Sequence, residues 1–281
     1  MFIINQGFLT SIISFMAENI RKISVSQPTV TEEDKAAVLD CLDKTFLSGD
    51  SPVVAEFESN FSNVVDRNYG IAVANGSVAL DVVLHALDLQ PGDEVILPSF
   101  TIASCLFAIL RTGAKPVFVD VEDGTWNMSL NTIQEKVTVK TRVVMVVHIY
   151  GLPVDMDPII EFCAMNSIVI IEDAAEAHGV RYRGKMCGSF GLASTFSFYA
   201  NKAITAGEGG MVVTDDDDFR DKIRYLRNLA FAPPPGKRFV HTDLGWNLRL
   251  SSLQAALANS QLKRLDAITD RKRGIGLAYH S

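Results

Sequence analysis

A single lysine, Lys202, stands in the segment SFYANKAITAGEGGM, which covers residues 197–211. The aromatic residues before it are typical of a strand, and the GEGG turn after it holds too much glycine for a helix. A primary amine in this setting can bond covalently to a carbonyl compound, a common catalytic use of lysine. A solvated surface lysine is the ordinary alternative, but it needs no such surroundings. We therefore expect Lys202 to be catalytic.

An aspartate, Asp173, ends the apolar run of the segment IIEDAAEAHG at residues 170–179. A carboxylate at the end of a buried strand loses hydration unless a cation or several donors compensate. Asp173 is therefore either a helix cap or ion-pair partner, or a group that faces a ligand. Glu176 and His178 follow closely, and either could line the same site, although His178 could equally be a plain loop residue.

The segment ANGSVAL at residues 74–80 places Gly76 and Ser77 between an expected strand and an expected helix start. Glycine lets a ligand approach the backbone, and the free N–H groups at a helix N-terminus bind phosphate. On its own, the segment favours an ordinary tight turn in which Ser77 caps the helix. Its position ahead of the other two segments strengthens the phosphate-binding interpretation.

These three features together match the needs of pyridoxal phosphate (PLP). Its phosphate requires a helix N-terminus, its aldehyde requires an amine, and its ring nitrogen requires a carboxylate that keeps it protonated. The segments supply these groups in the order phosphate loop, Asp173 and Lys202. The sequence therefore predicts PLP as the cofactor, and no metal.

At these motifs the sequence resembles the DegT/StrS family of PLP-dependent nucleotide-sugar aminotransferases, which have fold type I. FSFYANKAITAGEGGMVVT resembles the family's lysine motif, and EDAAEAHG its aspartate motif. ANGSVALDVVLHAL resembles its phosphate loop, and DLGWNLRLSSLQAALANSQL its later asparagine motif. FVDVEDGTWNMS and VHIYGLPVDMDPI are also similar to family sequences. The resemblance runs from about Ile23 to the end of the chain. Within the family, the most similar members are GDP-perosamine synthase-like, as judged from the segments EDAAEAHG and NKAITAGEGG.

The resemblance implies a role for each group near the cofactor ring. Lys202 would form a Schiff base with the aldehyde and later move a proton between the substrate carbon and the cofactor. Asp173 would pair with the pyridinium nitrogen, and Glu176, at a position that is often glutamine, would lie beside the ring. Ile102 stands where many relatives carry an aromatic residue that stacks on the ring, and isoleucine offers no π-face.

The resemblance also implies how the phosphate is held and how the subunits assemble. Gly76, Ser77 and Ser197 would bind the phosphate. Asn247 would reach the phosphate of the neighbouring subunit's cofactor, so the active unit would be a homodimer with shared active sites. Without the family, Asn247 would be an ordinary loop hydrogen-bonding residue.

The implied activity is transfer of an amino group from glutamate to a nucleotide-linked 4-keto-6-deoxy sugar, as in perosamine-type aminosugar synthesis for surface polysaccharide. Lys202 favours this over the related dehydratases, which carry histidine at that position. One alternative is a non-catalytic PLP-binding or regulatory protein, or an inactive truncated remnant. A nucleotide-dependent oxidoreductase is another, although GEGGM precedes a strand and so lacks the order of a dinucleotide fingerprint.

The elements that must position these groups alternate between strands and helices from residue 69 onward. YGIAVA, DEVILP, KPVFVDV, RVVMVVHIYG and IVIIED are expected strands, with helices in between. This order predicts an α/β fold, a three-layer αβα large domain with a mostly parallel sheet. Ligands of such sheets bind beyond the carboxyl ends of the strands, which is where the three motifs fall.

Three regions of the chain are expected. Residues 1–15 are predicted to be an N-terminal extension, with Met16 as the natural start. Residues 16–250 form the PLP-binding large domain, and APPPGKR at 232–238 is a loop within it. Residues 251–281 are predicted to form one long amphipathic helix that leads toward a C-terminal small domain, most of which is missing relative to the longer family members.

Composition narrows the partners and the compartment. The chain has 281 residues, of which 48% are hydrophobic, and a formal net charge of −7. A negative charge argues against nucleic acid or an anionic membrane, since both select basic surfaces. Four widely spaced cysteines form no C-x-x-C pair, which disfavours a zinc site or disulfides and favours a reducing cytoplasm. Each cysteine is expected to be a small buried hydrophobic residue.

Overall fold

A computed structural model describes residues 24–231 and 240–280. The expected extension at 1–15 and the loop at 232–238 lie outside the described residues. No helix within the described ranges is both long and apolar enough to cross a membrane.

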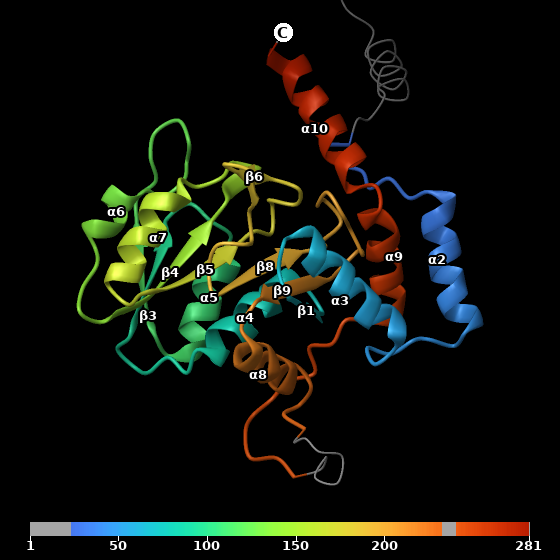
Figure 1. The fold of residues 1–281 in the computed structure, drawn as a ribbon, viewed down its shortest axis with the longest axis horizontal. Coiled ribbons are helices and arrows are strands. Elements are labelled where there is room, and N and C mark those ends of the chain that lie inside the picture. Colours follow the sequence, from blue (N-terminus) through green and yellow to red (C-terminus); the bar gives the residue numbers. More distant parts are fainter. Residues whose placement is uncertain (1–23, 232–239, 281) are drawn as a thin grey trace, which may run out of the picture.

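A seven-stranded sheet forms the centre of the fold (Figure 1), in the order β1-β9-β8-β5-β4-β2-β3. The five strands from β8 to β3 are parallel, whereas β9 is antiparallel to both of its neighbours. The mostly parallel α/β sheet expected from the sequence is therefore confirmed. The strands are β1 (Tyr69–Val73), β2 (Glu94–Pro98), β3 (Lys115–Val119), β4 (Thr141–Val147), β5 (Val169–Asp173), β8 (Ala193–Ser197) and β9 (Gly210–Thr214).

Helices cover both faces of this sheet, which gives three layers (Figure 1). One face carries α4 (Gly76–Ala86), α5 (Ala103–Thr112) and α8 (Asp217–Arg227). The other carries α3 (Pro52–Val64), α6 (Leu130–Gln134), α7 (Met156–Met165) and α9 (Ser252–Leu262). Outside these layers lie α2 (Glu32–Asp43), η1 (Ile149–Gly151), α10 (Leu265–His280) and a two-stranded hairpin, β6 (Arg181–Tyr182) with β7 (Lys185–Met186).

The period-two alternation of strand side chains explains this layering. In β9, Val212 packs into the core beneath α4, whereas Met211 and Val213 pack into the core beneath α3. In β5, Ile171 faces the α4 layer and Ile170 faces the α7 layer. Because both faces are buried, these strands appear as nearly continuous apolar runs in the sequence.

The C-terminal segment differs from the single helix expected over 251–281. It forms two helices, α9 and α10, separated at residues 263–264. At the junction the Arg264 N–H bonds to the Gln261 carbonyl, three residues back, instead of the four-residue spacing of an α-helix. The junction contains neither glycine nor proline, so no breaker residue marks it in the sequence. Helix α9 is mostly buried and packs against α2 and α3.

Candidate active site

A cavity of about 780 Å³ lies at the carboxyl ends of the parallel strands. Its lining comes from segments that follow β1, β2, β4, β5 and β8 in the chain. The parallel direction of the strands brings these ends to one edge of the sheet, although the segments are far apart in the sequence. Seven of the eight site residues expected from the sequence line this cavity, namely Gly76, Ser77, Ile102, Asp173, Glu176, Ser197 and Lys202.

Lys202 faces the cavity in an ion pair with Glu176. The distance from Lys202 Nζ to Glu176 Oε1 is 3.1 Å, and the lysine side chain is only 15% exposed. The other carboxylate oxygen, Oε2, accepts a hydrogen bond from the Tyr150 backbone N–H at 2.8 Å. Glu176 therefore connects the lysine to the short η1 segment after β4, and it fixes where the amine points.

Asp173 is buried at the end of β5, with 4% of its surface exposed. Its Oδ1 accepts from the Ala175 N–H at 3.0 Å, and its Oδ2 accepts from the Cys105 thiol at 3.1 Å. Burial raises the pKa of Asp173, although the two hydrogen bonds and the nearby positive charge of Lys202 act in the opposite direction. A cation placed against this carboxylate would stabilise its charged form.

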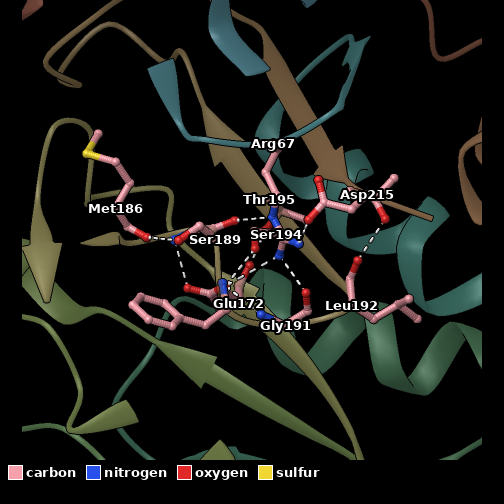
Figure 2. A network of polar contacts seen from close by, with 12 residues as sticks. Arg67, Glu172, Met186, Ser189, Gly191, Leu192, Ser194, Thr195 and Asp215 are labelled. Carbon is pink, nitrogen blue, oxygen red and sulfur yellow. Dashed lines mark hydrogen bonds and ion pairs between the residues drawn. The ribbon is translucent and has the colours of Figure 1, made fainter. Parts of the chain in front are cut away.

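The preceding residue, Glu172, lies on the opposite face of the sheet from Asp173, since neighbouring residues of a strand point to opposite faces. It belongs to a network of polar contacts at the end of β5 (Figure 2). Its buried carboxylate accepts hydrogen bonds from the backbone N–H groups of residues 188, 190 and 191, from the Ser194 hydroxyl and from His148 Nε2. Burial alone would raise the pKa of Glu172, but these donors, His148 first among them, lower it to about 2. Arg67 closes the network by bonding to the Gly188 and Gly191 carbonyls and to Asp215. The network therefore holds the backbone that carries Asp173.

The start of α4 approaches β8 too closely for any side chain at residue 76. A Cβ atom added to Gly76 would lie 2.7 Å from Ser197 Cβ and 3.1 Å from Ser197 Oγ. The N-cap Asn75 accepts from the Val78 N–H, so the N–H groups of Gly76 and Ser77 are not used by this cap. The Ser77 hydroxyl bonds to Ser104 of α5 at 2.7 Å. Gly76 therefore permits a helix N-terminus with two adjacent hydroxyl groups, from Ser77 and Ser197, at the cavity wall.

Two of the expected residues are placed differently from the rest. Ile102 is the N-cap of α5 and is 62% exposed at the cavity, where its aliphatic side chain offers no aromatic face. Asn247 does not line the cavity and instead forms an isolated β-bridge with Asn228. Within one chain, the structure thus leaves Asn247 apart from the other site residues.

A second cavity of about 540 Å³ adjoins Lys202 and Glu176 on the side of α10. His178 lines it and is 5% exposed, with its ring against Phe61, Phe196 and Phe198. Its Nε2 has no hydrogen-bond partner among the described residues. Burial, together with the charges of Lys202 and Lys272, lowers the pKa of His178 to about 3. His178 is therefore a neutral, packed residue at neutral pH.

Sequence reasoning missed three contributors to the site. Cys105 was expected only to fill space, and it is buried as predicted, but its thiol also contacts Asp173. Tyr150 and His148 were expected to lie within the strand RVVMVVHIYG, but β4 ends at Val147, and these residues contact Glu176 and Glu172 from the turn that follows it. Their positions immediately after an apolar strand, at the sheet edge where ligands bind, were the available signal.

A family model matches residues 28–281, and its description is the DegT/DnrJ/EryC1/StrS aminotransferase family. The chain belongs to this family. Among curated relatives, the GDP-perosamine synthase of Escherichia coli O157:H7 is 41% identical over 260 residues, which cover 92% of this chain and 71% of the relative. The GDP-perosamine synthase of Caulobacter vibrioides is 40% identical, over 92% of this chain and 69% of the relative. The pleiotropic regulatory protein of Geobacillus stearothermophilus is 36% identical, covering 88% and 67%.

Solved structures of aminotransferases share the fold. The aminotransferase from Psychrobacter cryohalolentis superimposes with a TM-score of 0.80 at 35% identity, over 85% of this chain and 63% of that one. The PLP-form of the putative sugar aminotransferase Spr1654 from Streptococcus pneumoniae superimposes with a TM-score of 0.86 at 26% identity, over 92% of this chain and 71% of that one. The fold is therefore that of fold type I aminotransferases, and PLP is the cofactor that the family indicates. This chain spans about two thirds of the length of these relatives.

The residues at the cavity fit PLP. A cavity of about 780 Å³ is large enough for the cofactor together with part of a substrate. The close approach at Gly76 leaves backbone N–H groups and hydroxyls at one wall, where an anion can bind. Burial raises the pKa of Asp173, and a cation such as a protonated ring nitrogen placed against it would stabilise its charged form. The Lys202 amine lines the same cavity.

Proposed function

We propose that this protein transfers an amino group from glutamate to the keto carbon of a nucleotide-linked 4-keto-6-deoxy sugar, in perosamine-type aminosugar synthesis for surface polysaccharide. The observation that carries the proposal is that Lys202 and Asp173 line one cavity together with the N-terminus of α4. The names of the relatives support the substrate class, since three are GDP-perosamine synthases and a fourth is a spore coat polysaccharide biosynthesis protein.

Each side chain has a defined task in this proposal. When bound, PLP supplies an aldehyde that reacts with amines and a ring that accepts electrons. Lys202 supplies the amine that holds the cofactor, and when released it carries a proton to or from the substrate carbon. Asp173 keeps a proton on the ring nitrogen. Glu176 orients the lysine through the 3.1 Å contact.

The start of α4 would hold the phosphate. The backbone N–H groups of Gly76 and Ser77 at the start of α4 face an anion, and the positive end of the helix dipole favours it. The hydroxyl groups of Ser77 and Ser197 add donors. With a net charge of −7, the chain must bind an anionic group through such local donors and not through its overall field.

We further propose that the protein assembles as a homodimer with shared active sites, which would give Asn247 a role. Asn247 lies outside its own chain's cavity, so we infer that it serves the cavity of a second copy. Mixed dimers of Lys202→Ala and Asn247→Ala chains test this, since one of their two sites would then contain both native residues. Mixing should restore tight PLP retention in one of the two sites of each mixed dimer, whereas each variant alone should retain PLP poorly. No gain on mixing would contradict shared sites.

We propose that the protein is located in the cytoplasm. The four free, buried cysteines are compatible with that reducing compartment.

Two measurements test the activity. PLP-loaded protein is reduced with borohydride and digested, and the labelled peptide should contain Lys202. Addition of L-glutamate to unreduced protein should then convert the cofactor to its amino form, seen by visible absorption. Lys202→Ala should abolish both signals, whereas the exposed Lys136→Ala should change neither. A label elsewhere in the chain would refute the assignment of Lys202.

One alternative retains support from two observations. A relative at 36% identity is named a pleiotropic regulatory protein, and Ile102 supplies no stacking face for the ring. A regulatory PLP-binding protein would label at Lys202 but would not convert its cofactor with glutamate. The glutamate measurement therefore separates the two functions, and conversion would exclude the regulatory alternative.

A further inference from the structure

A chain of hydrogen bonds runs from the cavity wall to the buried carboxylate of Asp173. Thr101 Oγ1 lies 3.2 Å from Cys105 Sγ, and Cys105 Sγ lies 3.1 Å from Asp173 Oδ2. Cys105 is on α5 with no exposed surface, whereas Thr101 precedes α5 and lines the cavity. These contacts connect the β2–α5 segment to the end of β5, over a sequence separation of 68 residues.

The chemistry of the groups determines the direction of these bonds. A carboxylate only accepts hydrogen bonds, so the Cys105 thiol must donate to Asp173. The sulfur then has no proton left for Thr101, and it accepts from the threonine hydroxyl. Burial and the charge of Asp173 raise the pKa of the Cys105 thiol well above its usual range, so the sulfur keeps the proton that it donates.

We propose that Cys105 is a positioning residue for Asp173, whose carboxylate it orients in the cavity by thiol donation to Oδ2. With Ala175 N–H on Oδ1 and Cys105 on Oδ2, each carboxylate oxygen has one fixed donor, and the rotation of the carboxylate is restricted. One lone-pair direction on each oxygen remains for a cationic group in the cavity. The benefit to the ring nitrogen rests on the proposed function, whereas the hydrogen bond itself does not.

The other buried cysteines provide an internal comparison. Cys163 on α7 is 1% exposed, and burial alone raises its pKa to about 11. No hydrogen bond from its sulfur is found among the described residues. Cys163→Ala therefore removes a buried thiol of the same size without touching a carboxylate, which makes it the matched control for Cys105→Ala.

The first test uses protein without cofactor and measures the infrared S–H stretch. Subtraction of the Cys105→Ala spectrum from that of the unaltered protein isolates the Cys105 band, and subtraction of the Cys163→Ala spectrum isolates the control band. Donation to a carboxylate should move the Cys105 band to lower frequency than the Cys163 band. Coincident bands would overturn the proposal while leaving the function of Lys202 untouched.

The second test measures the titration of the Asp173 carboxyl group in the same cofactor-free protein, identified by subtraction of Asp173→Asn. Cys105→Ala removes a hydrogen-bond donor to the charged form of Asp173, so the titration midpoint of Asp173 should rise by about 0.5–1 pKa unit. The charged groups that face Asp173, Lys202 and Glu176, are the same in both proteins. Cys105→Ser should restore the midpoint, since a hydroxyl donates as well. An unchanged midpoint in Cys105→Ala, or failure of serine to restore it, would overturn the proposal.

A third measurement links the contact to the cofactor. PLP-loaded Cys105→Ala should release PLP several-fold faster than the unaltered protein, with Cys105→Ser close to the unaltered rate and Cys163→Ala unchanged. Equal release from Cys105→Ala and the unaltered protein would contradict a positioning role. A failure of the unaltered protein to attach PLP at Lys202 would instead refute the proposed function, and the infrared and titration results would still decide the hydrogen bond.

Discussion

Lys202 Nζ and Glu176 Oε1 lie 3.1 Å apart, so the amine that is expected to hold the cofactor is already in an ion pair. The same carboxylate accepts from the Tyr150 N–H, which keeps it in place. An aldehyde can react with this amine only once the amine has left the carboxylate oxygen. The pair therefore orients the lysine and at the same time slows its reaction.

Glu176→Gln should accelerate the attachment of PLP. The amide keeps an oxygen for the Tyr150 N–H but removes the ion pair that holds the amine, so the amine should be freer to react with the aldehyde. The gain should be about three- to tenfold. Rapid-mixing absorption at several pH values measures it, with the exposed Glu161→Gln on α7 as the control. A slower reaction throughout would show that the carboxylate charge assists attachment.

Gly76→Ala should weaken PLP binding more than it weakens the fold. The new Cβ would lie 2.7 Å from Ser197 Cβ, so α4 and the end of β8 must separate. We expect PLP affinity to fall by more than about tenfold and stability to fall by about 1–3 kcal/mol. Fluorescence titration with PLP and urea unfolding measure the two effects. Gly274→Ala on α10, where a Cβ meets nothing within 4 Å, should leave PLP affinity unchanged.

Ile102→Phe should tighten PLP binding. Ile102 is exposed at the cavity, and a phenyl ring there can stack on a pyridine ring, a contact worth about 0.5–1.5 kcal/mol. The dissociation constant of PLP should fall by about two- to tenfold. Leu110→Phe, also exposed on α5 but outside the cavity lining, is the control. Equal or weaker binding by Ile102→Phe would mean that residue 102 does not face the ring.

His178→Phe should stabilise the protein, and increasingly so at lower pH. The pKa of His178 is about 3 in the folded protein, below its value of 6.5 in the unfolded chain. Below pH 6.5 the unfolded chain therefore binds a proton that the native state does not, and stability is lost as the pH falls. Phenylalanine removes this loss, so the stability gain over the unaltered protein should grow by about 2 kcal/mol between pH 7 and pH 5.

Urea unfolding at several pH values tests this prediction. His148→Phe is an informative contrast, since His148 Nδ1 accepts from the Val154 N–H and its Nε2 contacts Glu172. Removal of these bonds should destabilise the protein at every pH in the series. A pH-independent effect of His178→Phe would show that the histidine is protonated in the native state or reaches solvent.

Local patterns were sufficient to predict most of the strands and several residues of the cavity, whereas Ile102 was expected only from the family resemblance. Lys202, Asp173 and Gly76 each stand beside a strand end, and the chain direction in a parallel sheet brings such ends together. The antiparallel direction of β9 was missed, although the segment between Ser197 and Gly210 holds no crossover helix. A parallel connection needs such a crossover, so this feature was predictable from the sequence.

The sequence by itself determined the α/β class and the family, and it indicated the residues that we propose for PLP, because these depend on short-range periodicity and on motifs of a few neighbouring residues. The tertiary structure alone decided that Cys105 donates to Asp173, that Tyr150 anchors Glu176 and that Asn247 lies apart from its own cavity. These contacts join residues that are distant in the chain, such as Cys105 and Asp173. Their geometry depends on how α5 and η1 pack against the sheet, and no local pattern encodes that packing.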